Sequence, residues 1–219
     1  MTARVLPDDA AGRVAAIGVL RAGGIVALPT DTVYGICVAL NTPGGIERLF
    51  EVKRRPADKG IMLLLDDAEQ AGQIGSMTPA ALALADACWP GGLTVVIPQR
   101  PDVSLPAALT AGSATIGLRV PDHDAPRGLA RVVGPLPTTS ANVSGMPEAR
   151  DAAGIVAQLG ESIDLVLDGG RAHGGPASTV VDCSGLLALI LREGAVSTAR
   201  VLEILDASHV PFRAGTGGS

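Results

Sequence analysis

Residues 25–40 read IVALPTDTVYGICVAL, and this stretch indicates how the chain folds. Two apolar runs, IVALP and VYGICVAL, have the length and composition of buried strands, and a short polar bend separates them. A helix is predicted on each side, over residues 9–21 and 45–54, the first capped by Asp8 or Asp9. The first helix is expected to bury one face, formed by Ala10, Val14, Ile17 and Leu20.

The rest of the chain repeats this alternation of strands and helices. Further strands are predicted at residues 60–65, 93–98, 115–121, 163–170, 178–184 and 187–194. Further helices are predicted at residues 78–89, 125–133, 149–160 and 197–205. The pattern predicts an α/β fold with a largely mixed sheet, in one domain over residues 1–207. Residues 208–219, which end in FRAGTGGS, are expected to form a flexible tail.

Composition narrows the function classes. Aromatic residues make up only 2% of the chain, too few for the stacking platforms of many proteins that bind single-stranded RNA. A net charge of −5 argues against a sequence-blind polyanion binder but allows a local basic pocket. The cysteines and histidines lack metal-ligand spacing. With no signal peptide and no long apolar run, we expect a cytosolic protein without a membrane span.

The stretch EVKRRPADKG, residues 51–60, holds the only two lysines of the chain, Lys53 and Lys59. With Arg54 and Arg55 they place four positive charges within seven residues, at a helix end that precedes Pro56. Such a corner can hold triphosphate oxygens, by the planar fork of arginine and the compact charge of lysine. The alternative is a solvated basic helix end. That alternative would accept arginine as readily, and this chain uses lysine nowhere else.

Two segments are rich in hydroxyl groups. PTDTVYG, residues 29–35, lies between two strands, where α/β proteins place binding loops. A polar turn in which Asp31 bonds nearby amides is the alternative. PLPTTSANVSG, residues 135–145, runs from a strand-like start into a loop whose hydroxyls and amide suit a nucleotide. A surface turn rich in small polar residues explains it equally well in isolation.

Two arginines stand in apolar runs. Arg119 lies between Leu118 and Val120, so it either reaches a sheet edge or meets an anion. A carboxylate ligand is a natural partner for it, and a structural ion pair is the alternative. Arg192 stands alone at the end of a predicted strand. Neither the P-loop nor the dinucleotide-binding glycine pattern occurs in the chain.

Taken together, six segments resemble the YrdC-like family, which includes the threonylcarbamoyl-AMP synthases of tRNA modification. They are ALPTDTVYG, KRRPADKG, WPGGLTVVIP, TIGLRVPDH, TTSANVSG and STVVDCSG…ILREG, in the family's order over about residues 10–200. The resemblance implies a twisted open mixed sheet flanked by helices. It also implies a nucleotidyltransferase that makes threonylcarbamoyl-AMP and pyrophosphate from L-threonine, bicarbonate and ATP. Mg²⁺ would accompany the ATP, and no metal-binding side chains are implied.

The resemblance implies site residues as well. The family hallmarks K-x-R and S-x-N read Lys53-Arg54-Arg55 and Ser140-Ala141-Asn142 here. Lys53 and Arg55 are implied to be catalytic, by neutralising negative charge together with Mg²⁺. The residues implied to bind ATP are Lys53, Arg55, Lys59, Thr115, Ser140, Asn142 and Arg192. Those implied to bind threonine are Thr32, Arg119, Thr138 and Ser178, with Arg119 facing the carboxylate.

One departure concerns residues 62–65, MLLL, where many relatives carry a histidine near threonine. The implied partner is a downstream transferase complex that moves the threonylcarbamoyl group to tRNA, with weak tRNA binding by this chain as a further expectation. Three other interpretations are open. They are a non-catalytic RNA-binding protein of this fold, an inactive paralogue, and a carbamoyl transferase of the hydrogenase-maturation type, for which the chain is short.

Overall fold

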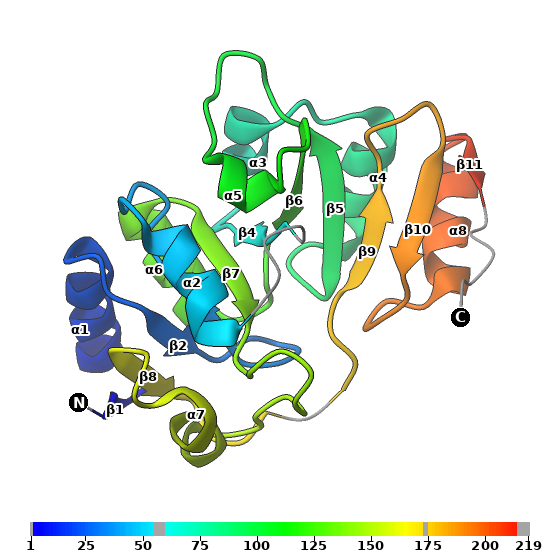
Figure 1. Ribbon diagram of the computed structural model, residues 1–219. Coiled ribbons are helices and arrows are strands. Elements are labelled where there is room, and N and C mark those ends of the chain that lie inside the picture. Colours follow the sequence, from blue (N-terminus) through cyan, green and yellow to red (C-terminus); the bar gives the residue numbers. More distant parts are fainter. Residues whose placement is uncertain (1, 55–59, 173–174, 214–219) are drawn as a thin grey trace.

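The computed structural model describes residues 2–54, 60–172 and 175–213, which form one sheet of eleven strands with helices packed against it (Figure 1). The strand order is β1-β8-β2-β3-β7-β4-β6-β5-β9-β10-β11. The strands are β1 (Arg4–Pro7), β2 (Val26–Leu28), β3 (Gly35–Cys37), β4 (Met62–Leu64), β5 (Leu93–Pro98), β6 (Thr115–Arg119), β7 (Leu136–Ser140), β8 (Leu165–Asp168), β9 (Thr179–Asp182), β10 (Ala188–Arg192) and β11 (Phe212–Arg213).

The sheet is mixed, as the sequence predicts. Five strand pairs are parallel and five are antiparallel. Antiparallel pairing of β2 with β3 closes the bend at residues 29–34, and β3 then pairs with β7 so that Gly35 lies opposite Ser140. The two hydroxyl-rich segments, about 100 residues apart in sequence, therefore meet at neighbouring strand ends.

Eight helices connect the described strands, and every predicted helix is present. They are α1 (Ala10–Arg21), α2 (Gly45–Lys53), α3 (Ala68–Ile74), α4 (Pro79–Cys88), α5 (Ala107–Thr110), α6 (Asp124–Val133), α7 (Ala152–Leu159) and α8 (Thr198–Ala207). Six begin with a side chain that accepts a backbone N–H bond, from Asp9, Asp67, Thr78, His123, Asp151 and Ser197. No helix in the described part of the chain is both long and apolar enough to cross a bilayer.

Both faces of the sheet are buried, which explains the runs of consecutive apolar residues. In β4, Leu64 packs into the cluster that includes Leu20 of α1 and Leu129 of α6. Its neighbour Leu63 packs into a larger cluster on the other face, with residues of α2, α4 and α7. The same alternation holds in β2 and β8. A strand covered on both sides leaves only its ends and the adjoining loops for polar function.

The buried face of α1 differs from the prediction. Val14 is 69% exposed, and the helix buries Gly12 and Ala16 together with Leu20, the one residue of the predicted face that is fully buried. A Cβ atom at Gly12 would lie 2.0 Å from the carbonyl oxygen of Pro7, so the helix approaches the end of β1 at its glycine. An apolar pattern cannot reveal a face that is built around glycine and alanine.

The end of the described chain also differs from the prediction, which placed a flexible tail from residue 208. Phe212–Arg213 forms β11, which pairs in parallel with Ala188 and Leu189 of β10. The fold therefore extends through Arg213, beyond the boundary expected at residue 207. Residues 214–219 lie outside the described part of the chain.

The buried cysteines yield a prediction about alkaline stability. Cys37 and Cys183 are free and fully buried, and burial raises the pKa of Cys183 to about 12 and that of Cys37 even further. Unfolded thiols ionise near the ordinary value of 9.0, so this contribution to stability is present below that pH and is lost above it. We expect each thiol to remove up to about 1.4 kcal/mol of unfolding free energy per pH unit between about pH 9 and 11.

Urea titrations at about pH 8 and pH 10, on wild type and on Cys183→Ala, would measure this effect. The variant should lose less unfolding free energy between the two pH values. An equal loss in both proteins would show that other groups cause the alkaline destabilisation.

Candidate functional site

A cavity of about 330 Å³ opens where β4, β5, β6, β7, β9 and β10 come together. Seven residues implied by the family resemblance line it, namely Thr32, Thr115, Arg119, Thr138, Ser140, Ser178 and Arg192. These residues come from five separate segments of the chain, and the sheet topology brings them together. Lys53 and Asn142 lie beside the cavity rather than on its wall. Arg55 and Lys59 lie outside the described residues.

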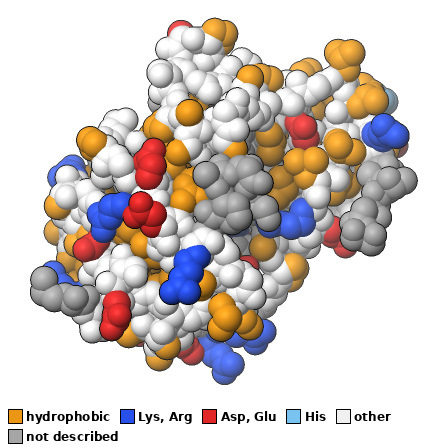
Figure 2. All heavy atoms as spheres, viewed as in Figure 1, with side chains coloured by type: hydrophobic (Ala, Val, Ile, Leu, Met, Phe, Trp, Pro, Cys, Tyr) orange, Lys and Arg blue, Asp and Glu red, His pale blue; other side chains and the backbone are white. Residues whose placement is uncertain are grey.

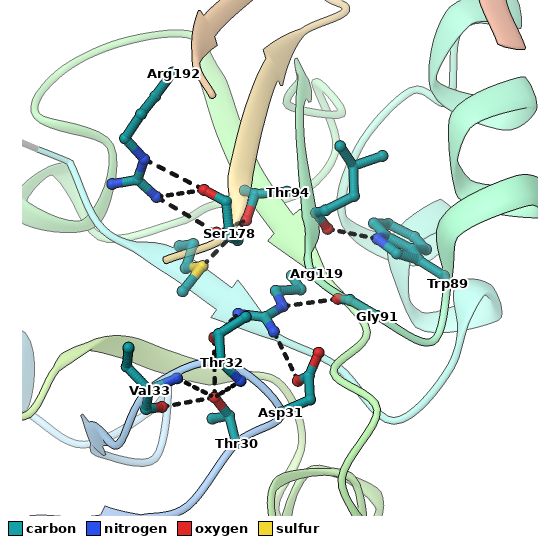
Figure 3. A network of polar contacts seen from close by, with 12 residues as sticks. Thr30, Asp31, Thr32, Val33, Trp89, Gly91, Thr94, Arg119, Ser178 and Arg192 are labelled. Atoms are coloured by element: carbon teal, nitrogen blue, oxygen red, sulfur yellow. Dashed lines mark hydrogen bonds and ion pairs between the residues drawn. The ribbon is translucent and has the colours of Figure 1, made fainter. Parts of the chain in front are cut away.

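Arg119 is the buried cation of the cavity (Figure 3). It is 2% exposed, and three groups from two loops hold its guanidinium. Its Nε donates to the carbonyl oxygen of Gly91 at 2.9 Å, its Nη1 to the hydroxyl of Thr32 at 2.9 Å, and its Nη2 to the carboxylate of Asp31 at 2.6 Å. The structural ion pair that the sequence left open as an alternative is thus present. It occurs together with the cavity position that a ligand would need.

The bend at residues 30–33 is built by one hydroxyl group. Oγ1 of Thr30 accepts the backbone N–H groups of Thr32 and Val33 and donates to the carbonyl oxygen of Val33 at 2.6 Å. This compact turn sets Asp31 and Thr32 side by side, one on each terminal nitrogen of Arg119 (Figure 3). The PTDTVYG segment is thus a polar turn that also lines a cavity, but Thr30 bonds the nearby amides, and Asp31, to which the alternative assigned that role, bonds Arg119 instead.

Asp31 is the acidic group that pairs with the buried charge of Arg119. Burial lowers the pKa of Arg119, Asp31 opposes that shift, and the nearby charge of Arg192 adds to it. Since a guanidinium ordinarily titrates above about pH 12, Arg119 remains a cation at neutral pH. Asp31 thus works as its counter-ion, and the sequence did not single this aspartate out as a site residue.

Arg192 and Ser178 form a second polar group in the lining of the cavity. The guanidinium of Arg192 donates to the carbonyl oxygen of Ser178 at 2.7 Å and 3.2 Å. The Ser178 hydroxyl shares a hydrogen bond of 2.8 Å with Thr94, a buried residue that also lines the cavity. Thr94 in turn lies 3.5 Å from the sulfur of Met62, which stands in the run where many relatives carry a histidine.

Thr94 is a functional candidate that sequence reasoning missed. It sits in the apolar run LTVVIP, where a threonine is an ordinary strand residue. Its hydroxyl can bond Ser178 only because β5 pairs with β9, and this contact makes Thr94 a candidate. A polar residue that alternates with valines in a strand covered on both faces is the signal that could have indicated it.

Lys53 is held in a cage of oxygen atoms. Its Nζ lies 2.5 Å from the carbonyl oxygen of Ser140 and 3.2 Å from its hydroxyl, and 2.8 Å from the carbonyl oxygen and 2.9 Å from the side-chain oxygen of Asn142. The side chain is 2% exposed. The two family hallmarks are therefore in direct contact, and the ammonium of Lys53 fixes the loop that follows β7.

The same loop is fastened at further points. The carbonyl oxygen of Lys53 accepts the N–H of Ser144 at 2.9 Å, and the Asn142 amide donates to the carbonyl oxygen of Met146 at 2.7 Å. Gln158 of α7 accepts the N–H of Val143 and donates to the carbonyl oxygen of Pro147. These contacts fix the conformation of the loop at residues 140–147. Ser140, at the start of this loop, lines the cavity.

Within the described residues, no three His, Cys, Asp or Glu side chains are placed to bind a metal ion together. The described lining of the cavity offers hydroxyls, two guanidinium groups and one carboxylate, that of Glu148, and therefore no cluster of acidic ligands for Mg²⁺. A magnesium site held by these side chains is therefore not supported, and an Mg²⁺ ion would depend on ligands such as phosphate oxygens.

Comparison with known proteins places this geometry in a family. The family model Sua5_yciO_yrdC, described as "Telomere recombination", matches residues 18–194. A provisionally named threonylcarbamoyl-AMP synthase of Mycobacterium tuberculosis is 38% identical over 195 residues, which cover 89% of each chain. The threonylcarbamoyl-AMP synthase of Bacillus subtilis is 32% identical over 197 residues, covering 89% of this chain and 57% of the relative.

A solved structure agrees with both sequence comparisons. The crystal structure of Pyrococcus abyssi Sua5 complexed with L-threonine superposes with a TM-score of 0.86 at 28% identity, over 97% of this chain and 62% of that one. The chain thus corresponds to about three fifths of the longer relatives and to nearly the whole of the shorter ones. The fold, the cavity and these matches agree, and the chain belongs to the Sua5–YciO–YrdC family.

Proposed function

We propose that the protein is an L-threonylcarbamoyladenylate synthase, a nucleotidyltransferase that makes threonylcarbamoyl-AMP and pyrophosphate from L-threonine, bicarbonate and ATP. One observation carries the proposal. A single cavity combines a buried arginine and a second arginine with a set of hydroxyl groups, in a chain 38% identical to a relative that bears this name provisionally. Two cations separated by neutral donors suit two substrates, one with a carboxylate and one with a triphosphate.

Threonine is proposed to bind at Arg119. A buried guanidinium beside hydroxyl groups can take an amino-acid carboxylate and leave further hydrogen bonds for the rest of the molecule. The hydroxyl-bearing neighbours are Thr32, Thr138 and Ser178, and all three are buried. The crystal structure of the Pyrococcus protein contains L-threonine, which supports an amino-acid site in this fold.

ATP is proposed to bind toward Arg192, Thr115 and Ser140, with the loop around Asn142 shaping that side. Arg55 and Lys59 are proposed as further phosphate contacts. In the reaction, bicarbonate takes up a proton and dehydrates to CO2 and water, and the neutral threonine amine adds to the CO2 with loss of a proton to form a carbamate. One carbamate oxygen then bonds to the α-phosphorus of ATP while the bond from that phosphorus to the leaving pyrophosphate breaks. The carbamate is already an anion, so no protein nucleophile or base is required for this step.

Catalysis under this proposal consists of positioning and charge neutralisation. Arg119 and Arg192 orient the two substrates in the cavity. Arg55 is proposed to neutralise charge on the phosphates, and Mg²⁺ would arrive with the ATP and supply further positive charge. Lys53 contributes by holding the Ser140–Asn142 loop, for which its contacts give direct support.

The proposal is tested by measuring pyrophosphate release from ATP with threonine or bicarbonate present or omitted. Release is expected to require both compounds, and the product should be threonylcarbamoyl-AMP by mass spectrometry. Release without threonine would indicate a different acceptor. A folded protein that releases no pyrophosphate under any of these conditions would contradict the synthase function.

Threonylcarbamoyl-AMP is an activated intermediate, so we propose a downstream transferase that passes its acyl group to tRNA, and the cytoplasm as the place of both reactions. Non-catalytic RNA binding is the second candidate. Among the described side chains on the face shown in Figure 2, basic and acidic residues are interspersed, which gives this candidate little support there. Weak, strongly salt-dependent tRNA binding would be compatible with the synthase, whereas tight binding would favour the RNA-binding alternative.

Thr94→Val tests the role of the Thr94 hydroxyl in the cavity, which sequence reasoning did not indicate. Valine keeps the volume and the strand propensity but cannot bond Ser178, so the Ser178 hydroxyl loses its 2.8 Å hydrogen bond and keeps only the longer contact with Arg192. We expect the KM for threonine to rise about fivefold to tenfold, which corresponds to one hydrogen bond, with little change in the KM for ATP. Steady-state pyrophosphate release at varied threonine measures it. Equal KM values for threonine in the two proteins would place the Thr94 hydroxyl outside the substrate site.

A further inference from the structure

Asp31 is the carboxylate bound to Arg119, yet it is absent from the cavity wall. Arg119 and Thr32 line the cavity, whereas Asp31 contacts the guanidinium without being among the lining residues. Its side chain is 17% exposed, and its oxygen lies 2.6 Å from Nη2. Asp31 therefore holds Arg119 from a position beside the ligand space, without filling that space.

The hydrogen bonds of Arg119 leave room for a ligand. A guanidinium has five N–H groups, and Gly91, Thr32 and Asp31 accept one each. In the contacts of the described residues, one N–H on each terminal nitrogen is not used. Two such donors on neighbouring nitrogens match the two oxygens of a carboxylate, but they match two oxygens of a phosphate equally well. Hydrogen-bond geometry alone cannot make this site selective.

Charge can provide the selectivity that geometry lacks. Arg192 makes its described contacts to the neutral backbone and hydroxyl of Ser178, so it presents a full positive charge. Arg119 is paired with an aspartate, so the net charge of the pair is close to zero. A phosphate dianion near Asp31 meets twice the repulsion of a carboxylate monoanion, while the ammonium of an amino acid is attracted.

We propose that Asp31 is the selectivity residue of this cavity. It positions Arg119 and reserves it for the carboxylate of a zwitterionic amino acid, and it keeps phosphate groups off that arginine. The triphosphate of the nucleotide is thereby directed to Arg192, which forms no ion pair within the described residues; Glu148 also lines the cavity but is not ion-paired with either arginine there. This inference rests on the proposed two-substrate function and adds the reason why two arginines in one cavity do not exchange their ligands.

The test is phosphate binding in the absence of ATP and threonine. Asp31→Asn keeps an oxygen that can accept from Nη2 but removes the negative charge. We expect calorimetry with inorganic phosphate to show at least about tenfold tighter binding to Asp31→Asn than to wild type, because one unit of repulsion at short range is lost. In activity assays, phosphate should become competitive with threonine in this variant, whereas in wild type it should compete with ATP alone.

The chain supplies a matched control. Arg100 and Asp102 form another arginine–aspartate pair, at 2.6 Å and 2.9 Å, which is exposed and lies away from this cavity. Asp102→Asn should leave phosphate binding and the KM for threonine unchanged. Asp31→Glu, which retains the charge, should still exclude phosphate, and it serves as the informative variant if Asp31→Asn proves unstable by thermal unfolding.

Two results would overturn the inference, namely equal phosphate affinity in wild type and Asp31→Asn, or tighter binding that persists in Asp31→Asn/Arg119→Met. The calorimetric test needs no catalytic turnover. If Asp31→Asn gains phosphate binding that the double variant loses, while wild type releases no pyrophosphate, the selectivity role stands and the proposed synthase function fails. Threonine-dependent pyrophosphate release by wild type, with unchanged phosphate affinity in Asp31→Asn, would support the synthase function and reject the selectivity role.

Discussion

Lys53→Met is expected to lower the rate of pyrophosphate release by about 100-fold to 1000-fold, the range found when one preorganised donor is removed from an active site. Methionine fills the same space without donating hydrogen bonds. The oxygens of Ser140 and Asn142 that surround Nζ would then lose a charged donor, although the Ser140 carbonyl still accepts from the Asn142 N–H and the Asn142 side-chain oxygen from the Ser140 hydroxyl. Each such loss costs about 1–3 kcal/mol, so the loop should move away from its present position.

The position of Lys53 explains why this chain keeps a lysine there. A compact ammonium can donate in three directions to a cage of oxygens, whereas a planar guanidinium is larger and has a fixed fork. Lys53→Arg should therefore be nearly as inactive as Lys53→Met. A solvated basic helix end, the alternative considered from the sequence, predicts that arginine restores activity. The 2% exposure of the side chain contradicts that alternative.

Hydrogen exchange separates a loop-holding lysine from a direct phosphate ligand. In Lys53→Met without nucleotide, the amides of residues 142–146 should exchange faster than in wild type. Gln158→Leu is the matched control, because it releases Val143 and Pro147 of the same loop without removing a charge. It should raise the KM for ATP about tenfold or more, since two hydrogen bonds to the loop are lost. Unchanged exchange in Lys53→Met, together with lost ATP binding, would assign Lys53 to the phosphates directly.

Much of this architecture was predictable because local patterns determine it. The runs around Val26, Leu64 and Leu165 are apolar on both faces and bounded by turn residues, which is typical of strands covered by helices. Helix starts were readable from capping side chains such as Thr78 and Ser197. The elements that were missed, β1, α3, α5 and β11, are short and have little apolar periodicity, and tertiary pairing makes them regular.

The site was predictable only in part, for a physical reason. Family motifs indicated Thr32, Arg119 and Arg192, and the cavity contains all three. The roles of Asp31 and Thr94 depend on which strands are neighbours, and a linear sequence does not record strand order. Lys53 illustrates the same limit. The scarcity of lysine in the chain indicated this residue, but its contacts lie on a loop 87–89 residues away, and the sequence does not show that contact.

Arg119→Met is expected to raise the KM for threonine by at least about 100-fold, since a paired, charge-assisted contact to a carboxylate contributes about 3 kcal/mol or more. The KM for ATP should change little, because Arg192 and Thr115 are unaffected. Arg119→Lys should behave similarly, since an ammonium cannot reach Gly91, Thr32 and Asp31 at once and also bind a ligand.

A stability control is essential at this position, because Arg119→Met leaves the carboxylate of Asp31 without its partner, and breaking such a pair costs about 3–5 kcal/mol when it is buried. Asp31→Asn/Arg119→Met removes both charges and should recover most of the lost melting temperature. Threonine binding, measured by calorimetry, should remain absent in this double variant. If binding returned with stability, the guanidinium would be a structural group. Recovered stability without recovered binding would identify Arg119 as the contact that the amino acid requires.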